Sequence, residues 1–137
     1  MSVYLSNGVV LTVNAVDLSS LVSSVTINRN FDELEITSMG DSGHRFVKGL
    51  EASSISIEFF NDSASSKTLQ TLNSPSVWGS SVTVTVKQTS ATTSAENPLY
   101  TMSCLINGTT PINGAVGDLS TQSVTWNVNG TIAITTS

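Results

Sequence analysis

The side chains that could do chemistry gather in one short stretch of the chain. Asp41, Ser42 and His44 are the residue types of a nucleophilic triad: an acid, a hydroxyl and a base. Close neighbours in a flexible loop cannot hold the base and its orienting group in the geometry that such a triad needs. We therefore expect no catalytic site, and we interpret the stretch as a solvated or interface loop.

Metal-ligating residues are too scattered to form a site. The chain has one His and one Cys, His44 and Cys104, sixty residues apart, whereas a zinc site needs clustered ligands. The acidic run of Asp32, Glu33 and Glu35 lacks the ligand spacing of a calcium loop. We expect no metal and no cofactor. The run is either a solvated strand edge or a negative surface that, with Glu58, faces a channel or pairs with a neighbour's Arg29, Arg45 or Lys48.

The region that must position these residues is the stretch 24–62, which predicts two strands joined by a long loop. In both strands apolar and polar residues alternate, a two-residue period that sends the two sets to opposite faces of a sheet. Each strand is therefore expected to be half buried. The apolar set is Val25, Ile27, Ile55, Ile57 and Phe59, and the polar set is Ser24, Thr26, Asn28, Ser54, Ser56 and Glu58.

The loop 34–50 between these strands is too long for a tight turn, and a loop of this length usually has a function. Its glycines can take positive φ, and its mixed charges would not pack in a core. Apolar residues flank the tip, so the loop extends the hairpin and could reach another subunit. The candidate inter-subunit residues are Leu34, Ile36, Met39, Gly40, Asp41, Gly43, His44, Arg45, Phe46 and Lys48.

The remainder of the chain predicts further strands and one short helix. Asn-Gly pairs mark hairpin turns, and Asp17 is a plausible cap for a single helical turn. The expected elements are a hairpin over 3–13 about Asn7-Gly8, a helix over 64–72, strands over 82–87 and 99–106, and a last hairpin of 123–128 with 131–135 about Asn129-Gly130. This pattern predicts one mainly β domain over 1–137, an antiparallel β-sandwich or partly open barrel with a flanking helix.

Composition narrows the classes of function. The 137 residues carry a net charge of −5, with 24 Ser and 18 Thr, and the five basic residues are scattered, which argues against stable nucleic-acid binding. Neither a leader peptide nor a run of about 20 apolar residues is evident, so we expect synthesis in a cytoplasm and no membrane partner. We also expect Cys104 and Trp126 to be buried and Trp78 to be more open to an interface.

The segment 32–62, DELEITSMGDSGHRFVKGLEASSISIEFFND, resembles the tail tube proteins of long-tailed bacteriophages, and weaker resemblance covers most of the chain. The resemblance implies a virion protein, made in the host bacterium, whose copies form rings of six that stack into a hollow tube for DNA delivery. It implies contacts with other tail proteins and with DNA only in transit. Ser24, Thr26, Asn28, Ser54, Ser56 and Glu58 would then face the lumen.

Two alternatives stay open. The chain is compact, with little terminal arm to hold stacked rings, so it could be a related minor tail component, either a terminator or a ring near the baseplate. The rival from another class is a carbohydrate-binding or adhesive β-sandwich, which a surface rich in hydroxyl groups also permits. Exposed aromatic residues over a shallow groove would favour that rival.

Overall fold

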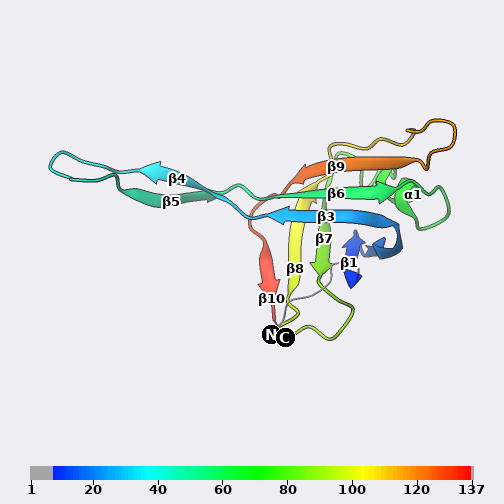
Figure 1. The fold of residues 1–137 in the computed structure, drawn as a ribbon, viewed down its shortest axis with the longest axis horizontal. Coiled ribbons are helices and arrows are strands. Elements are labelled where there is room, and N and C mark those ends of the chain that lie inside the picture. The colour runs from blue at the N-terminus through cyan, green and yellow to red at the C-terminus, as the bar shows by residue number, and fades with distance from the viewer. Residues whose placement is uncertain (1–7, 137) are drawn as a thin grey trace.

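Residues 8–136 are described by a computed structural model, and in this part of the chain the protein is mainly β, with antiparallel sheets and one short α-helix (Figure 1). The elements in chain order are β1 (Val10–Val13), β2 (Val16–Asp17), a 3-10 turn (Ser19–Leu21), β3 (Val22–Asn28), β4 (Phe31–Glu35), β5 (Phe46–Glu51), β6 (Ser54–Phe60), α1 (Thr68–Leu72), β7 (Ser81–Lys87), β8 (Leu99–Leu105), β9 (Thr121–Asn127) and β10 (Ala133–Thr135).

Two sheets make the body of the molecule. The large sheet has the strand order β10-β8-β7-β1-β2, and the small sheet has the order β3-β6-β9. The two sheets pack face to face, with their strands running crosswise (Figure 1). A third sheet, β4-β5, projects from the body as a separate ribbon.

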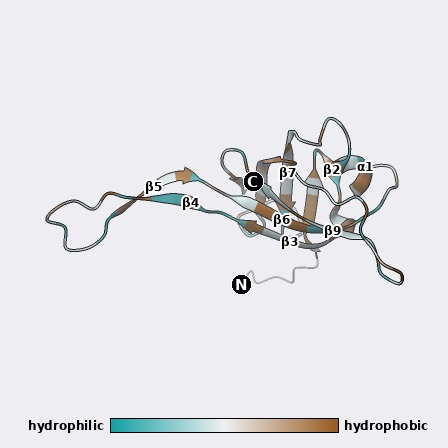
Figure 2. Cartoon of the chain, turned by 90° about the horizontal axis from the view of Figure 1, so that it is seen from above, coloured by the Kyte–Doolittle hydropathy of each residue, from teal (hydrophilic) through white to brown (hydrophobic). Residues whose placement is uncertain are grey.

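The core lies between the large and small sheets. Along each strand every second side chain points inward, so that Val84 from β7, Ile57 from β6 and Trp126 from β9 are all buried. Figure 2 shows hydrophobic residues along the strands of the body and hydrophilic ones along β4. Fully burying one large aliphatic or aromatic side chain contributes roughly 1.5–3 kcal/mol, so this layer dominates the stability of the fold.

Cys104 is buried in this core, as expected from the sequence. Burial in an apolar environment disfavours the thiolate and raises the pKa of the Cys104 thiol to about 12. The thiol therefore stays protonated and unreactive in the folded protein.

The first hairpin of the described residues joins β1 and β2. β1 pairs with β2 through a turn at Asn14 and Ala15, which both have positive φ, as a type I′ turn requires. The first half of the predicted hairpin about Asn7-Gly8, residues 3–7, lies outside the described residues. The expected turn after Asp17 is present, because the Asp17 carboxylate accepts a 2.9 Å hydrogen bond from the Ser19 amide.

The predicted last hairpin is wrong. β9 pairs with β6 in the small sheet, whereas β10 pairs with β8 in the large sheet. Between them Val128 bridges to Cys104, and the Asn129 amide donates to the Ser103 carbonyl. The Asn129-Gly130 corner thus carries the chain from one sheet to the other, and local turn propensity does not distinguish such a corner from a hairpin.

The predicted helix is shorter than expected, because α1 begins at Thr68 rather than at residue 64. Asp62 does bond the Ala64 amide, but Ser66 has a positive φ of 61°, which interrupts helical geometry between them. In the described part of the chain, no helix is long and apolar enough to cross a membrane.

Candidate functional site

The outer face of the small sheet is a continuous polar surface. The register between strands aligns three rows, each with one residue from β3, one from β6 and one from β9. These nine residues, here called the polar face, are Ser24, Glu58 and Ser123 in the first row, Thr26, Ser56 and Thr125 in the second, and Asn28, Ser54 and Asn127 in the third.

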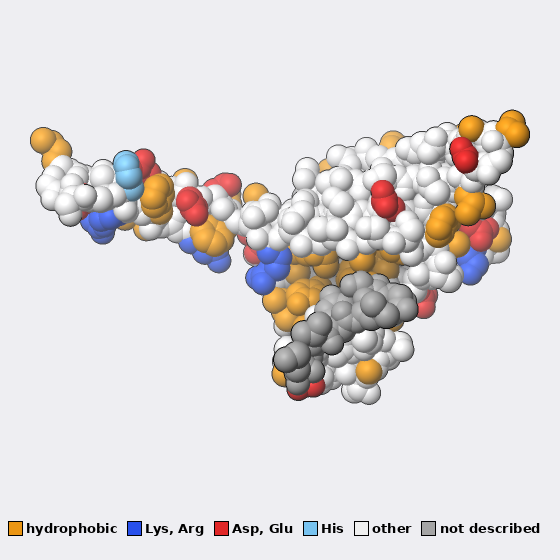
Figure 3. Space-filling view, viewed as in Figure 1, with side chains coloured by type: hydrophobic (Ala, Val, Ile, Leu, Met, Phe, Trp, Pro, Cys, Tyr) orange, Lys and Arg blue, Asp and Glu red, His pale blue; other side chains and the backbone are white. Residues whose placement is uncertain are grey.

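The polar face is exposed, apart from the half-buried Ser54 and Ser56, and it is nearly uncharged. Its only ionisable side chain is Glu58, and the Ser56 and Thr125 hydroxyl groups lie 3.0 Å apart in a hydrogen bond. The same surface faces the viewer in Figure 3, where it is mainly white, with few charged or hydrophobic side chains. All six predicted residues of the polar set lie on this one face.

Sequence reasoning missed the third strand of the polar face. Ser123, Thr125 and Asn127 alternate with the buried residues of β9, so the period was visible in the sequence. The missing information was that β9 pairs with β6, a contact between residues about seventy positions apart.

Both edges of the small sheet are free within the described residues. β3 and β9 are its outer strands, and each pairs with β6 on one side only. An edge strand presents unpaired N–H and C=O groups, which readily pair with another chain. The polar face thus sits on a sheet that a second copy could extend at either edge.

The second candidate surface is the ribbon of residues 31–51, here called the arm. It leaves the body where β3 ends and β6 begins, and it continues the direction of those strands (Figure 1). A 2.7 Å bond from the Ala52 amide to the Asn30 carbonyl closes its root, and the ladder between β4 and β5 extends to a bond from the Ile36 amide to Arg45. The sequence prediction that the loop extends the hairpin is therefore confirmed.

The arm has two different faces. Alternation along β4 places Leu34 and Ile36 on one side, and Val47, opposite Leu34, shares that side. Phe31 and Phe46 lie on the other side among charged residues, with the Lys48 ammonium 5.8 Å from the Phe31 ring. All five apolar side chains are at least 40% exposed. An isolated two-stranded ribbon is only marginally stable in water. The large exposed apolar area of the arm therefore indicates an interaction surface.

Polar contacts order the tip of the arm. The Glu35 carboxylate lies 2.6 Å from His44 Nδ1 and accepts a 2.8 Å bond from the Thr37 hydroxyl. The Asp41 carboxylate accepts from the Ser38 amide and lies 3.7 Å from the Arg45 guanidinium. His44 and Asp41 are thus bonded to residues of the tip and not to Ser42.

The remaining predicted arm residues differ in exposure. Met39 is fully exposed at the very tip, beside Gly40, which has a positive φ of 96°. Gly43 has open space around it. The three acidic residues of the run 32–35 lie on β4, and in the part of the chain that the structure describes no group of three or more potential metal ligands occurs.

Gly49 fixes the geometry of the arm, and we predict that Gly49→Ala disorders it. A Cβ at this position would lie 2.8 Å from the Asp32 carbonyl oxygen, closer than such atoms approach, so β4 and β5 would have to separate. We expect faster amide hydrogen exchange throughout residues 31–51 and unchanged exchange in the body. Gly43→Ala is the matched control, because a Cβ there meets nothing within 4 Å. Equal exchange in the two variants would contradict the prediction.

The order of the tip should depend on pH. Hydrogen bonds from His44 and then from Thr37 favour the carboxylate and lower the pKa of Glu35 below its ordinary value of 4.5. Because the pKa is lowered, the ionised Glu35 carboxylate helps to order the tip above about pH 4.5. This contribution is lost as the pH falls through the pKa that Glu35 has in the folded protein. NMR signals of the tip amides should therefore collapse in acid before those of the body. In Glu35→Gln the tip signals should show no such separate transition, and an unchanged transition would refute the assignment.

A third exposed apolar segment follows β8. Ile112, Val116 and Leu119 are each at least 77% exposed, while the base of their loop is held by Gln122, whose side-chain oxygen accepts bonds from Thr109 and Thr110. The loop is thus anchored at its base and apolar at its tip. The loop joins β8 to β9, and its apolar tip was not recognised from the sequence.

The core tryptophan and the exposed one behave as predicted. Trp126 is fully buried, and its ring lies 6.2 Å from that of Phe59, whereas Trp78 is 49% exposed.

No protein-family model matches the chain, and comparison with curated proteins finds no significant match.

Proposed function

We propose that this chain is a structural subunit of a bacteriophage tail tube, whose copies form rings, six to a ring, that stack into a hollow conduit for DNA. The observation that carries the proposal is the polar face of nine residues on a sheet with two free edges. The tail-tube resemblance of residues 32–62 supports it independently.

The free edges suggest how a ring closes. If β3 of one copy pairs with β9 of the next, a head-to-tail contact repeats around the ring and joins the small sheets into one barrel. Closure would satisfy the backbone groups that both edges expose. The polar face of every copy would then line the same central channel.

The chemistry of the polar face suits passage of DNA rather than its retention. Stable binding requires Lys or Arg to neutralise phosphates, and the nine residues include none. Hydroxyl and amide groups stay hydrated, and the carboxylate of Glu58 repels phosphate. A channel with this lining offers a duplex no strong contact along its length.

The arm supplies the second contact that a stacked assembly needs. It projects beyond the body, and its aliphatic face is exposed in the single copy. We propose that the arm contacts a subunit of an adjacent ring, and that its order depends on this contact. A minor tail component with the same fold, such as a terminator or baseplate-proximal ring, would share these features but form a single ring rather than a long tube.

The rival proposal, a glycan-binding sandwich, requires aromatic side chains stacked over a groove. The groove between the two sheets on the β3 side includes one aromatic residue, Tyr100, and neither tryptophan. This arrangement gives a sugar ring no pair of stacking partners, so we favour the tube.

Accessibility of the polar face to reagents of different size tests the proposal. Thr125→Cys places a thiol on the polar face, and Thr83→Cys is the matched control, because Thr83 is also an exposed strand threonine but lies on the large sheet. The native Cys104 is buried and gives little background. In assembled protein we expect residue 125 to react with a small maleimide but not with a maleimide on a large polymer.

The control position should react with both reagents in both states. Before assembly, the two variants should react alike. If residue 125 in the assembly reacted with the large reagent as fast as residue 83, the polar face would not line a narrow channel.

A further inference from the structure

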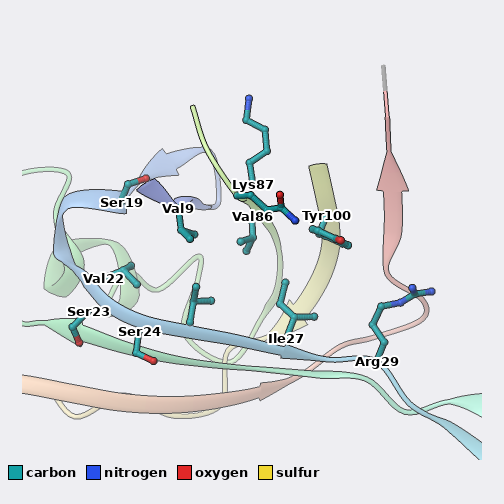
Figure 4. A pocket seen from close by; sticks show the side chains of 12 residues that line it. Val9, Ser19, Val22, Ser23, Ser24, Ile27, Arg29, Val86, Lys87 and Tyr100 are labelled. Carbon is teal, nitrogen blue, oxygen red and sulfur yellow. The ribbon is translucent and has the colours of Figure 1, made fainter. Parts of the chain in front are cut away.

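A groove opens between the two sheets on the β3 side of the body. It has a volume of about 740 Å³ and runs under the inner side of β3. Figure 4 shows Val22 and Ile27 pointing from β3 into this space, toward Val86 and Tyr100 on the opposite wall. Both β3 side chains are only half buried, so the described residues leave the core incompletely covered along this edge.

The charges of the groove have one sign. Among its described lining residues the charged side chains are Arg29, at the end where β3 runs into the arm, and Lys87 on β7. Neither makes an ion pair with the described residues. The groove thus has a lining of mixed polar and apolar side chains, and its two charged residues are both cationic.

The arm has the complementary character. Its aliphatic face presents Leu34, Ile36 and Val47. Its charged residues are five carboxylates, Asp32, Glu33, Glu35, Asp41 and Glu51, against two permanent cations, Arg45 and Lys48. A net negative ribbon is complementary in charge to a groove whose charged side chains are both positive, and both surfaces include aliphatic side chains.

The arm cannot reach its own groove. β3 runs on into β4 in nearly the same direction, so the arm points away from the body (Figure 1). The described residues leave both the apolar face of the arm and the groove uncovered, and the two cannot meet within one chain. A contact between them is therefore a contact between copies. Such a contact is head-to-tail and repeats along the direction of the arm.

We propose that the groove is the docking site for the arm of a second copy, with the aliphatic face of the arm against Val22, Ile27 and Tyr100. The inference rests on the proposed function and names the surface that receives the arm in that assembly. Under this proposal, successive rings are added along the direction in which the arm points.

Disulfide trapping tests the contact. In the double variant Leu34→Cys/Ile27→Cys the two thiols of one chain lie seven residues apart along nearly collinear strands, roughly 23 Å, far beyond the reach of a disulfide. Mild oxidation should therefore link each arm to the next groove and yield a ladder of covalent multimers. Leu34→Cys/Thr83→Cys is the control, with its second thiol on the far side of the large sheet, and it should stop at chance dimers.

A second double variant keeps the test independent of core packing. Gln88→Cys, combined with Leu34→Cys, places the groove thiol on the polar rim, and it should form the same ladder. Folded variants without a ladder, or a ladder of equal yield in the Thr83 control, would overturn the inference. Tubes seen by electron microscopy without a ladder would refute docking of the arm in the groove but support the tail-tube proposal. A ladder without tubes would support docking in the groove but refute the proposed function.

Discussion

Deletion of residues 39–45 is expected to abolish assembly while leaving a stable monomer. The deletion removes the tip of the arm and leaves a three-residue link between β4 and β5, so no contact of the body is lost. Stability of the body should change by no more than about 0.5 kcal/mol, as for surface changes away from packed elements. Polymer formation should disappear at concentrations where the parent assembles, as measured by sedimentation velocity.

A replacement variant separates the length of the arm from its side chains. Exchanging residues 39–45 for seven Gly and Ser residues keeps the reach of the loop but removes the Asp41–Arg45 and His44–Glu35 contacts. We expect weakened assembly in this variant and none in the deletion. Normal assembly by the deletion variant would show that the arm does not join subunits.

Trp126→Ala is expected to cause the largest loss of stability. Trp126 is fully buried between the sheets, contacts Phe59, and donates a 3.4 Å hydrogen bond from Nε1 to the Gly108 carbonyl. Removing a buried indole leaves a cavity that a close-packed core fills only in part, which costs about 3–5 kcal/mol. This cost is a large share of the 5–15 kcal/mol that typically holds a domain of this size together, and urea unfolding at 25 °C would measure it.

Trp78→Ala is the matched control for the buried tryptophan. Trp78 is 49% exposed, so its removal should cost roughly 1 kcal/mol or less in the monomer. Similar losses in the two variants would contradict the assignment of Trp126 to the core. A loss of assembly in Trp78→Ala without a loss of stability would instead place Trp78 at an interface.

The parts of the fold that depend on local pattern could be predicted from the sequence. The two-residue alternation along β3 and β6 gave both their buried sides and their polar sides, because each strand carries its own period. The flanking residues Leu34 and Phe46 likewise indicated that the long loop is an extension of the hairpin. In these cases the information lies within a few residues of the element that it specifies.

The parts that depend on distant pairing could not be predicted. The Asn129-Gly130 corner has the residues of a hairpin turn, yet β9 and β10 pair with strands of different sheets. The rows of the polar face and the groove between the sheets require knowledge of which strands are neighbours. A single sequence contains the period of each strand but not the partner that completes it.

Electron microscopy of the purified protein over a range of concentrations tests the central claim most directly. The proposal predicts rings or stacked tubes with a central hole, whose long axis follows the arm and whose walls place the polar face inward. Particles that stay single at every concentration, with a folded body and an intact arm, would contradict self-assembly into a tube.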